Sequence, residues 1–263
     1  MKIQIGFLWL FLASCSLTPV NTPLPFELQL PIFKNFELGT LEGFYPELPT
    51  LSNAQMVTPP PGGPLNLGTR SLQLTVAPGQ EVNHGNRAEV ALYQVGQYGS
   101  TVFFGWRFYI PTGDPDSFTW QIMAQWYQLP DFWKGENFDA FFAHPPVVFT
   151  YTPGFVEVQT SVGGEVTLGK TPITKGNWHS VVYEICFRDD AQGFVQVWVD
   201  GIPLTPSNGT DNRVYRPTLH NRAGTYWKLG LYRGIPSQTQ APTTNSVILD
   251  NIAVGSTYNE VLP

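Results

Sequence analysis

The chain has 263 residues, of which 42% are hydrophobic, 14% aromatic and only 13% charged, and its formal net charge is -6. The hydrophobic content excludes a disordered chain and supplies a core for one large all-β domain or two small ones. No basic stripe is present, so a nucleic-acid partner is not expected. A few cations gathered in one cleft would still allow a polyanionic substrate.

The first residues are typical of an export signal. Lys2 precedes an apolar stretch over residues 3–12 that is too short to span a bilayer. The run LASC at 12–15 resembles a bacterial lipobox, in which the cysteine becomes the lipidated mature N-terminus. We therefore expect a signal segment over residues 1–15 and an exported protein. It is either anchored to the cell envelope through lipidated Cys15 or secreted after cleavage at an ordinary signal peptide.

The rest of the chain has the organisation of one β domain. Residues 16–32 are rich in Thr, Pro, Asn and Leu and are expected to form a tether before a domain over residues 33–263. Within that domain, VTPPPGGPLN (57–66) and IPSQTQAPTTNS (235–246) are predicted loops. Between them lie short alternating segments separated by turn residues, without a long helix or an internal repeat. This pattern predicts an all-β sandwich.

The alternation predicts which side chains share a face, because successive strand residues point to opposite sides. Segment 101–110 has one large apolar face, formed by Val102, Phe104, Trp106, Phe108 and Ile110. In segment 119–128, one face is formed by Trp120, Ile122, Ala124 and Trp126, and the other by Gln121, Met123, Gln125 and Tyr127. The second faces of the strands also carry Arg107, Trp198, Lys228 and Tyr232. Aromatic, amide and cationic groups of this kind suit a groove in which sugar rings stack and carboxylates are held.

Several motifs then point to one family. The segment YWKLGLYRG (226–234) resembles the YFKxGxY signature of jelly-roll polysaccharide lyases, a group with alginate, heparin-I-type and glucuronan lyases. NHGNRAEV (83–90) resembles their Arg-x-Glu strand, IMAQWYQLPD (122–131) their catalytic-site Gln segment, and residues 176–204 and 246–258 their hairpin and closing strand. The resemblance covers roughly residues 35–260 and implies a β-jelly-roll sandwich with a concave substrate groove. Alginate lyases have Gln-x-His where Tyr127 stands here, whereas His84 lies where glucuronan lyases place a histidine.

The resemblance implies cleavage of a polyuronide by β-elimination, which needs a neutralised C6 carboxylate, a base for the C5 proton and an acid for O4. Tyr232 is expected to be the acid, and also the base if elimination is syn. His84 is either the base or a further neutraliser. Gln125 and Arg87 are expected to hold the carboxylate, although Arg87 could instead pair with Glu89.

Four further side chains are expected to contact the substrate from the same groove, namely Lys228, Arg107, Tyr127 and Trp198. Lys228 lies four residues before Tyr232, roughly 13 Å along an ideal strand. We therefore expect it to contact a substrate carboxylate and not the phenol. His179, at the start of a predicted strand, is expected to be structural.

A structural calcium ion is also implied by the resemblance. NFELGTLEGF (35–44) and the closing LDN (249–251) resemble the arrangement in which a Glu near the first strand and an Asp near the last bind Ca²⁺. Glu37 and Asp250 are the candidate ligands, because carboxylate oxygens suit this ion. The alternative is two ordinary surface acids. Cys and His are too sparse for a zinc site.

Two other functions compete with a lyase. A non-catalytic, lectin-like carbohydrate-binding module would use the same sandwich and aromatic groove without needing Tyr232, His84 and Gln125 together. A laminarinase-type glycoside hydrolase would need two closely placed carboxylates, and the sequence has no Glu-x-Asp-x-x-Glu strand. The expectation is a monomeric lyase whose partner is an acidic polysaccharide.

Overall fold

The computed structural model describes residues 29–116, 120–138, 144–204, 212–234 and 243–263. The predicted signal segment, the lipidation site at Cys15 and most of the tether lie outside these residues. No helix in the described ranges is long and apolar enough to cross a membrane.

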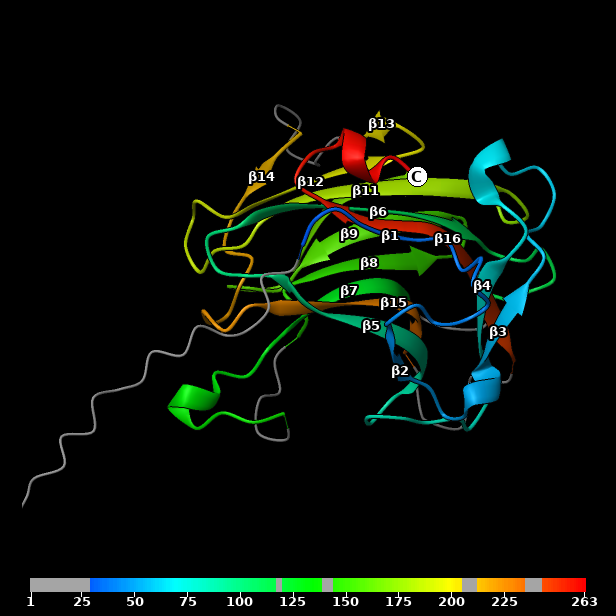
Figure 1. The fold of residues 1–263 in the computed structure, drawn as a ribbon. Helices are drawn as coiled ribbons and strands as arrows, with labels where there is room; N and C mark the ends of the chain where they lie inside the picture. Colours follow the sequence, from blue (N-terminus) through cyan, green and yellow to red (C-terminus); the bar gives the residue numbers. More distant parts are fainter. Residues whose placement is uncertain (1–28, 117–119, 139–143, 205–211, 235–242) are drawn as a thin grey trace, which may run out of the picture.

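Two antiparallel sheets pack face to face, which confirms the predicted jelly-roll sandwich (Figure 1). Sheet A has the order β13 (Ile202–Pro203), β12 (Phe194–Val199), β11 (Trp178–Cys186), β6 (Thr101–Tyr109), β16 (Asn245–Gly255), β4 (Ser71–Val76) and β3 (Ala54–Val57); β1 (Ile32–Lys34) pairs with β16 and β14 (Val214–Tyr215) with β12. Sheet B has the order β10 (Val166–Pro172), β9 (Phe155–Thr160), β8 (Val147–Thr152), β7 (Gln121–Gln128), β15 (Thr225–Arg233), β5 (Asn86–Gly96) and β2 (Tyr45–Glu47). The helical elements of the described residues are four short 3-10 turns, η1 (Leu51–Asn53), η2 (Leu65–Leu67), η3 (Phe132–Lys134) and η4 (Asn259–Val261).

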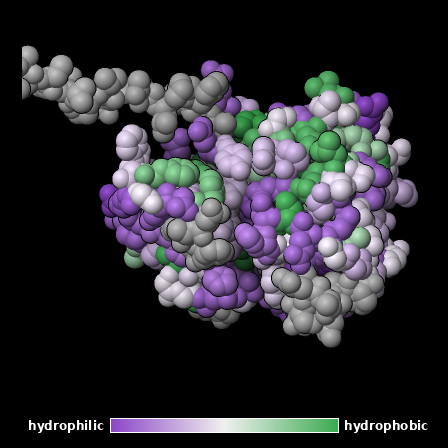
Figure 2. Space-filling view, turned by 90° about the horizontal axis from the view of Figure 1, so that it is seen from below, coloured by the Kyte–Doolittle hydropathy of each residue, from purple (hydrophilic) through white to green (hydrophobic). Residues whose placement is uncertain are grey.

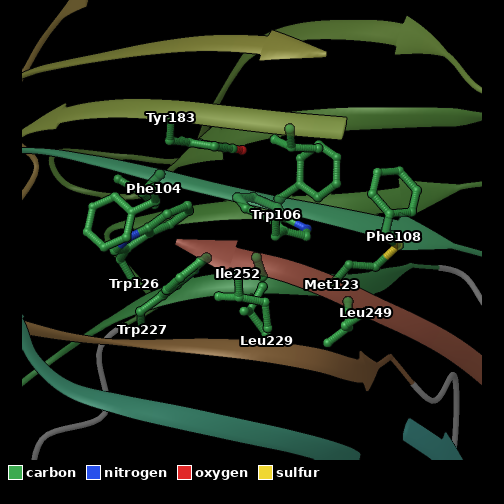
Figure 3. Close-up of a cluster of buried hydrophobic side chains, with 14 of the residues drawn as sticks. Phe104, Trp106, Phe108, Met123, Trp126, Tyr183, Trp227, Leu229, Leu249 and Ile252 are labelled. Carbon is green, nitrogen blue, oxygen red and sulfur yellow. The ribbon is translucent and has the colours of Figure 1, made fainter. Parts of the chain in front are cut away.

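The core fills the space between the two sheets and is unusually aromatic (Figure 3). The predicted alternation of β6 is confirmed, because Phe104, Trp106 and Phe108 all point into the core and are fully buried. On sheet B, Trp126 of β7 stacks on Trp227 of β15 with 5.8 Å between ring centroids. Full burial of large apolar side chains stabilises the fold by roughly 1.5–3 kcal/mol each. The core therefore stabilises the inner faces of the central strands β7 and β15.

Strand β7 departs from the predicted alternation. Its pairing with β8 shifts register between Ile122 and Ala124, and Met123 and Ala124 both belong to the core. Ile122 and Trp120 instead line the outer face of sheet B. The prediction that Trp120 and Ile122 share a face with Ala124 and Trp126 is wrong, because a β-bulge inserts one residue and reverses the alternation on one side of it.

Two residues expected in the groove lie on the other sheet. Arg107 is on β6 and Trp198 on β12, both in sheet A. The Arg107 guanidinium donates a hydrogen bond to the carbonyl oxygen of Pro263. Trp198 packs edge-on against Tyr258, with 4.8 Å between ring centroids. Their predicted place in the substrate groove is wrong, because alternation identifies the non-core face of a strand but not the sheet to which the strand belongs.

A buried histidine fastens the β11–β12 hairpin of sheet A. Nδ1 of His179 lies 2.7 Å from Oδ2 of Asp200, and its Nε2 lies 3.0 Å from the carbonyl oxygen of Thr174. Nδ1 therefore faces a carboxylate, whereas Nε2 lies near both the carbonyl oxygen of Thr174 and its backbone N–H, the latter at 3.2 Å. Burial by itself would lower the pKa of His179, but the hydrogen bonds to Asp200 and to the Thr174 carbonyl outweigh it and raise that pKa. These contacts agree with the structural role expected for His179.

Candidate active site

A groove with a volume of about 740 Å³ lies on the outer face of sheet B. Figure 2 looks onto this side of the molecule and shows a hollow bordered by both hydrophilic and hydrophobic residues. Side chains from β2, β5, β7, β8, β9 and β15 line it, together with loops at its rim. Six of the predicted site residues meet in it, which are Tyr232, His84, Gln125, Arg87, Lys228 and Tyr127.

Tyr232 is held between two neighbours in the floor of the groove. On β15 it lies directly opposite Arg87 of β5, and the guanidinium carbon of Arg87 is 3.8 Å from the centroid of the phenol ring. A guanidinium over an aromatic face is attracted by the ring quadrupole, by about 0.5–2 kcal/mol depending on exposure. Trp120 meets the same ring edge-on, with 5.2 Å between centroids. The phenol therefore has a defined orientation.

His84 reaches the groove on a tight turn. Val82 and Gly85 exchange two backbone hydrogen bonds of 3.0 and 3.1 Å, and Asn83 and His84 between them have φ of 48° and 60°. Two positive φ values are those of a type I′ turn, which tightens the hairpin. A Cβ atom on Gly85 would lie 2.5 Å from Cε2 of Tyr232. The glycine therefore lets this turn pack against the phenol and places the exposed His84 on the rim beside it.

A fully buried carboxylate, Glu89, orients two of the predicted residues. It accepts hydrogen bonds from Nη1 of Arg87 at 3.2 Å and from Nε2 of Gln125. Gln125 is on β7 and Glu89 on β5, on opposite sides of β15, so this bond spans the central strand. The pairing of Arg87 with Glu89 is the structural alternative that the sequence left open. It leaves the guanidinium in the groove floor.

A second buried carboxylate, Glu47, could not be identified from the sequence. It lies on the three-residue strand β2, which is too short to show an alternation. Its Oε2 is 2.7 Å from Nζ of Lys228, 3.0 Å from Nδ2 of Asn83 and 3.9 Å from Nη1 of Arg87. Lys228 is only 3% exposed. The ammonium that was expected to meet a substrate carboxylate thus already has a carboxylate partner.

Tyrosines form an aromatic wall at one part of the groove. Tyr93 stacks on Tyr226 with 4.7 Å between centroids, Tyr45 meets Tyr93 edge-on, and Tyr127 packs against Tyr226. Burial, followed by the charge of Glu47 and the neighbouring Tyr45, raises the pKa of Tyr93 to about 12. Burial likewise raises the pKa of Tyr127 and of Tyr226. These phenols stay neutral at physiological pH and offer ring faces and hydroxyls to sugars.

Among the described groove-lining residues, the hydroxyls of Thr150 and Thr160 and two polar atoms of the floor are buried without a hydrogen-bond partner. The two atoms of the floor matter most. They are Nε of Arg87 and Oε1 of Gln125, both buried. A buried donor without a partner costs about 1–3 kcal/mol, so the Arg87 Nε–H favours the arrival of an acceptor. The second hydrogen of the Gln125 amide nitrogen is a further donor, since Glu89 accepts only one of the two. Beside Tyr232, these groups are arranged to receive a carboxylate next to a proton donor.

The predicted calcium ligands lie near one another at the β4–β16 side of sheet A. Both carboxylates contact one short segment, since Glu37 accepts from Thr69 and from the backbone N–H of Arg70, and Oδ2 of Asp250 accepts from Ser71. Burial raises the pKa of Asp250 to about 7, with the charge of Glu37 acting in the same direction and the hydrogen bonds from Ser71 and the backbone N–H of Asn251 opposing it.

Next to Asp250, the buried Oδ1 of Asn251 has no partner among the described residues. In the described ranges no three His, Cys, Asp or Glu side chains cluster, so other ligands would have to be amide and carbonyl oxygens. An all-oxygen set of this kind fits Ca²⁺, and the cation would offset the cost of both the buried carboxylate and the unpaired amide oxygen.

Comparison with known proteins assigns the chain to a family. Residues 64–253 match the model of a family described as polysaccharide lyase, and this is more than half of the chain. The chain therefore belongs to the polysaccharide lyases, and it is an enzyme with the jelly-roll fold of that class. No curated protein matches it.

Solved structures share the fold at low sequence identity. The endo-β-1,4-glucuronan lyase from the fungus Trichoderma reesei has a TM-score of 0.64 and 19% identity, covering 85% of this chain and 95% of that chain. The family 7 alginate lyase A1-II′ has a TM-score of 0.52 and 16% identity, covering 71% and 80%. The marine alginate lyase from Aplysia kurodai has a TM-score of 0.51 and 10% identity, covering 78% and 88%.

Proposed function

We propose that this polysaccharide lyase cleaves a polyuronide in the groove of sheet B by β-elimination, and that glucuronan-like chains are its first candidate substrate. The observation that carries the proposal is the grouping of Tyr232, Arg87, Gln125 and His84 in one groove. The names of the similar structures, which are glucuronan and alginate lyases, support a uronic-acid substrate.

In this proposal each of these side chains has a task. Arg87 and Gln125 bind the C6 carboxylate and stabilise the charge that develops there when C5 loses its proton. His84 or Tyr232 removes that proton, and the electron pair of the C5–H bond forms the C4=C5 double bond. The C4–O4 bond breaks, and Tyr232 protonates the departing O4. The products are a new chain end at O4 and an unsaturated uronyl end.

Two proposals concern the rest of the chain. A structural Ca²⁺ held by Glu37 and Asp250 would neutralise the buried carboxylate and fasten β16 to the segment before β4. The chain is exported, and Cys15 carries the lipid that anchors it to the cell envelope; the LASC run supports this.

The experiment is incubation with a panel of polyuronides while the ultraviolet absorbance of the unsaturated product is followed. Tyr232→Phe should lower turnover by about 10²–10⁴-fold, the range for a positioned acid or base. Tyr258→Phe is the matched control, because Tyr258 packs against Trp198 of sheet A and does not line the groove, and it should keep full activity. Near-full activity of Tyr232→Phe, with both variants folded by circular dichroism, would remove Tyr232 from the mechanism. Reducing ends without absorbance would indicate a hydrolase, and binding without either signal a lectin.

A further inference from the structure

The floor of the groove carries no excess of positive charge. Among the described lining residues, the Lys and Arg side chains are Arg87 and Lys228. Each is paired with a buried carboxylate, Arg87 with Glu89 at 3.2 Å and Lys228 with Glu47 at 2.7 Å. Two positive charges are thus balanced by two negative charges. The floor can orient one substrate carboxylate, but it does not attract a polyanion along its length.

The rest of the chain does not supply the missing cations. The segments outside the described ranges within the domain (117–119, 139–143, 205–211 and 235–242) contain no Lys or Arg. Nearby lysines are paired elsewhere, Lys134 with Asp131 at 3.1 Å and Lys170 with Glu157 at 3.0 Å. The exposed Glu165, on the turn between β9 and β10, also lines the groove and adds a negative charge. Arg216 donates to the carbonyl oxygens of Val162 and Gly164, on the turn that carries Glu165, but it does not line the groove.

The remaining lining is neutral and suited to uncharged sugars. Tyr45 and Tyr93 present partly exposed rings, on which the apolar faces of pyranose rings can stack. The opposite wall, from β8 and β9, offers hydroxyl and amide groups from Thr150, Gln159 and Ser161. These groups form hydrogen bonds with sugar hydroxyls and do not compensate a carboxylate.

From this balance we propose that the groove selects acidic polysaccharides of low charge density, in which the uronate that is cleaved is flanked by uncharged sugars. The proposal rests on the proposed β-elimination activity, but within the polyuronides it ranks a copolymer with uncharged sugars above a chain such as glucuronan, in which every sugar carries a carboxylate. A carboxylate bound beside the aromatic wall loses water without gaining an unpaired cation, which is unfavourable. The reacting uronate is the exception, because Nε of Arg87 and the amide of Gln125 can receive its carboxylate.

The test uses polymers that differ only in charge. Glucuronan and alginate are each compared intact and after a graded share of their carboxylates has been reduced chemically to hydroxymethyl groups. We expect kcat/KM per remaining uronate to rise by about fivefold or more on partial reduction. This factor corresponds to the repulsion between two like charges about 4 Å apart in water. Added salt should raise the rate on the intact polymer and narrow this gap, because the Debye length shortens from about 30 Å at 0.01 M to about 10 Å at 0.1 M.

A charge variant locates the effect in the groove. Glu165→Gln should raise kcat/KM on the intact polymer more than on the reduced one, whereas Glu260→Gln, on the sheet A side of the molecule, should change neither. A rate that grows with carboxylate density and falls with salt would overturn the inference while leaving the lyase activity in place. If neither polymer in any form gives unsaturated product, the proposed function itself fails and takes the inference with it.

Discussion

Replacing Gly85 by alanine tests the geometry of the site without removing any functional group. The added Cβ would lie 2.5 Å from Cε2 of Tyr232 and 2.9 Å from Nη2 of Arg87, whereas ordinary contact begins at 3.4 Å. The ring or the turn must therefore move by about 0.9 Å, the difference between 3.4 and 2.5 Å. A misplacement of about 1 Å can cost 10²-fold in rate. We expect a loss of about 100-fold in kcat, with a stability cost of about 1–3 kcal/mol from overpacking.

The assay is the initial rate of unsaturated product on the best uronan, with the melting temperature measured in parallel. Gly113→Ala is the matched control, because nothing lies within 4 Å of its added Cβ, and it should behave as wild type. In the Tyr232→Phe background, Gly85→Ala should cost little more, since the group that it displaces no longer transfers a proton. If folded Gly85→Ala keeps its rate within about threefold, the packing of the turn on Tyr232 does not matter for catalysis.

Four other changes have defined outcomes. Lys228→Met should destabilise the protein by about 3–5 kcal/mol in denaturant unfolding, because it leaves its buried carboxylate partner uncompensated; an unchanged midpoint would show that the pair contributes nothing. A chelator should lower the melting temperature of the wild type and calcium should restore it, whereas the melting temperature of Asp250→Asn should respond to neither. Equal melting curves of the wild type with and without chelator would argue against a bound calcium ion. The raised pKa of His179 and the lowered pKa of Asp200 mean that their pair stabilises the fold most between about pH 4 and 6.5. This contribution is lost as pH rises through the folded pKa of His179. The melting temperature of His179→Gln should therefore change less with pH over this range than that of the wild type. Parallel curves of melting temperature against pH for the two proteins would contradict the role given to the His179–Asp200 pair. Cys15→Ser should abolish partition with bacterial membranes, and identical fractionation of the two forms would exclude the lipid anchor.

The sequence predicted the class of fold and most of the groove because alternation and motif spacing are local properties. The core face of β6 follows directly from a run of large apolar side chains at every second position. Tyr232 and Gln125 were found because they lie within motifs on the long central strands β15 and β7. These strands are also the ones that the aromatic core fixes most tightly.

The errors have two physical causes. Trp120 and Ile122 were assigned to the same face as Ala124 and Trp126 because a bulge leaves no mark in the sequence, and one inserted residue reverses which face every residue on one side of it points to. Arg107 and Trp198 were assigned to the groove because both sheets of a sandwich have a non-core face. Glu47 was missed for a third reason. Its importance comes from contacts with strands far away in sequence, and a three-residue strand has no periodicity to reveal it.

Arg87, Gln125 and Tyr232 lie on β5, β7 and β15, and this placement separates substitutions that alter the chemistry from substitutions that alter which polymer is bound. These strands lie side by side in the interior of sheet B and share their packing with the central core, so substitutions on them disturb chemistry and folding together. The hydroxyl and amide wall comes instead from β8 and β9, and the rim comes from the edge strand β2 and the surrounding turns, although Tyr93, Tyr127 and Tyr226 of the aromatic wall lie on the three central strands. Descendants of this chain can therefore exchange one polymer for another by altering residues of β8, β9 and the rim turns other than the one that carries His84, while the elimination step is inherited unchanged.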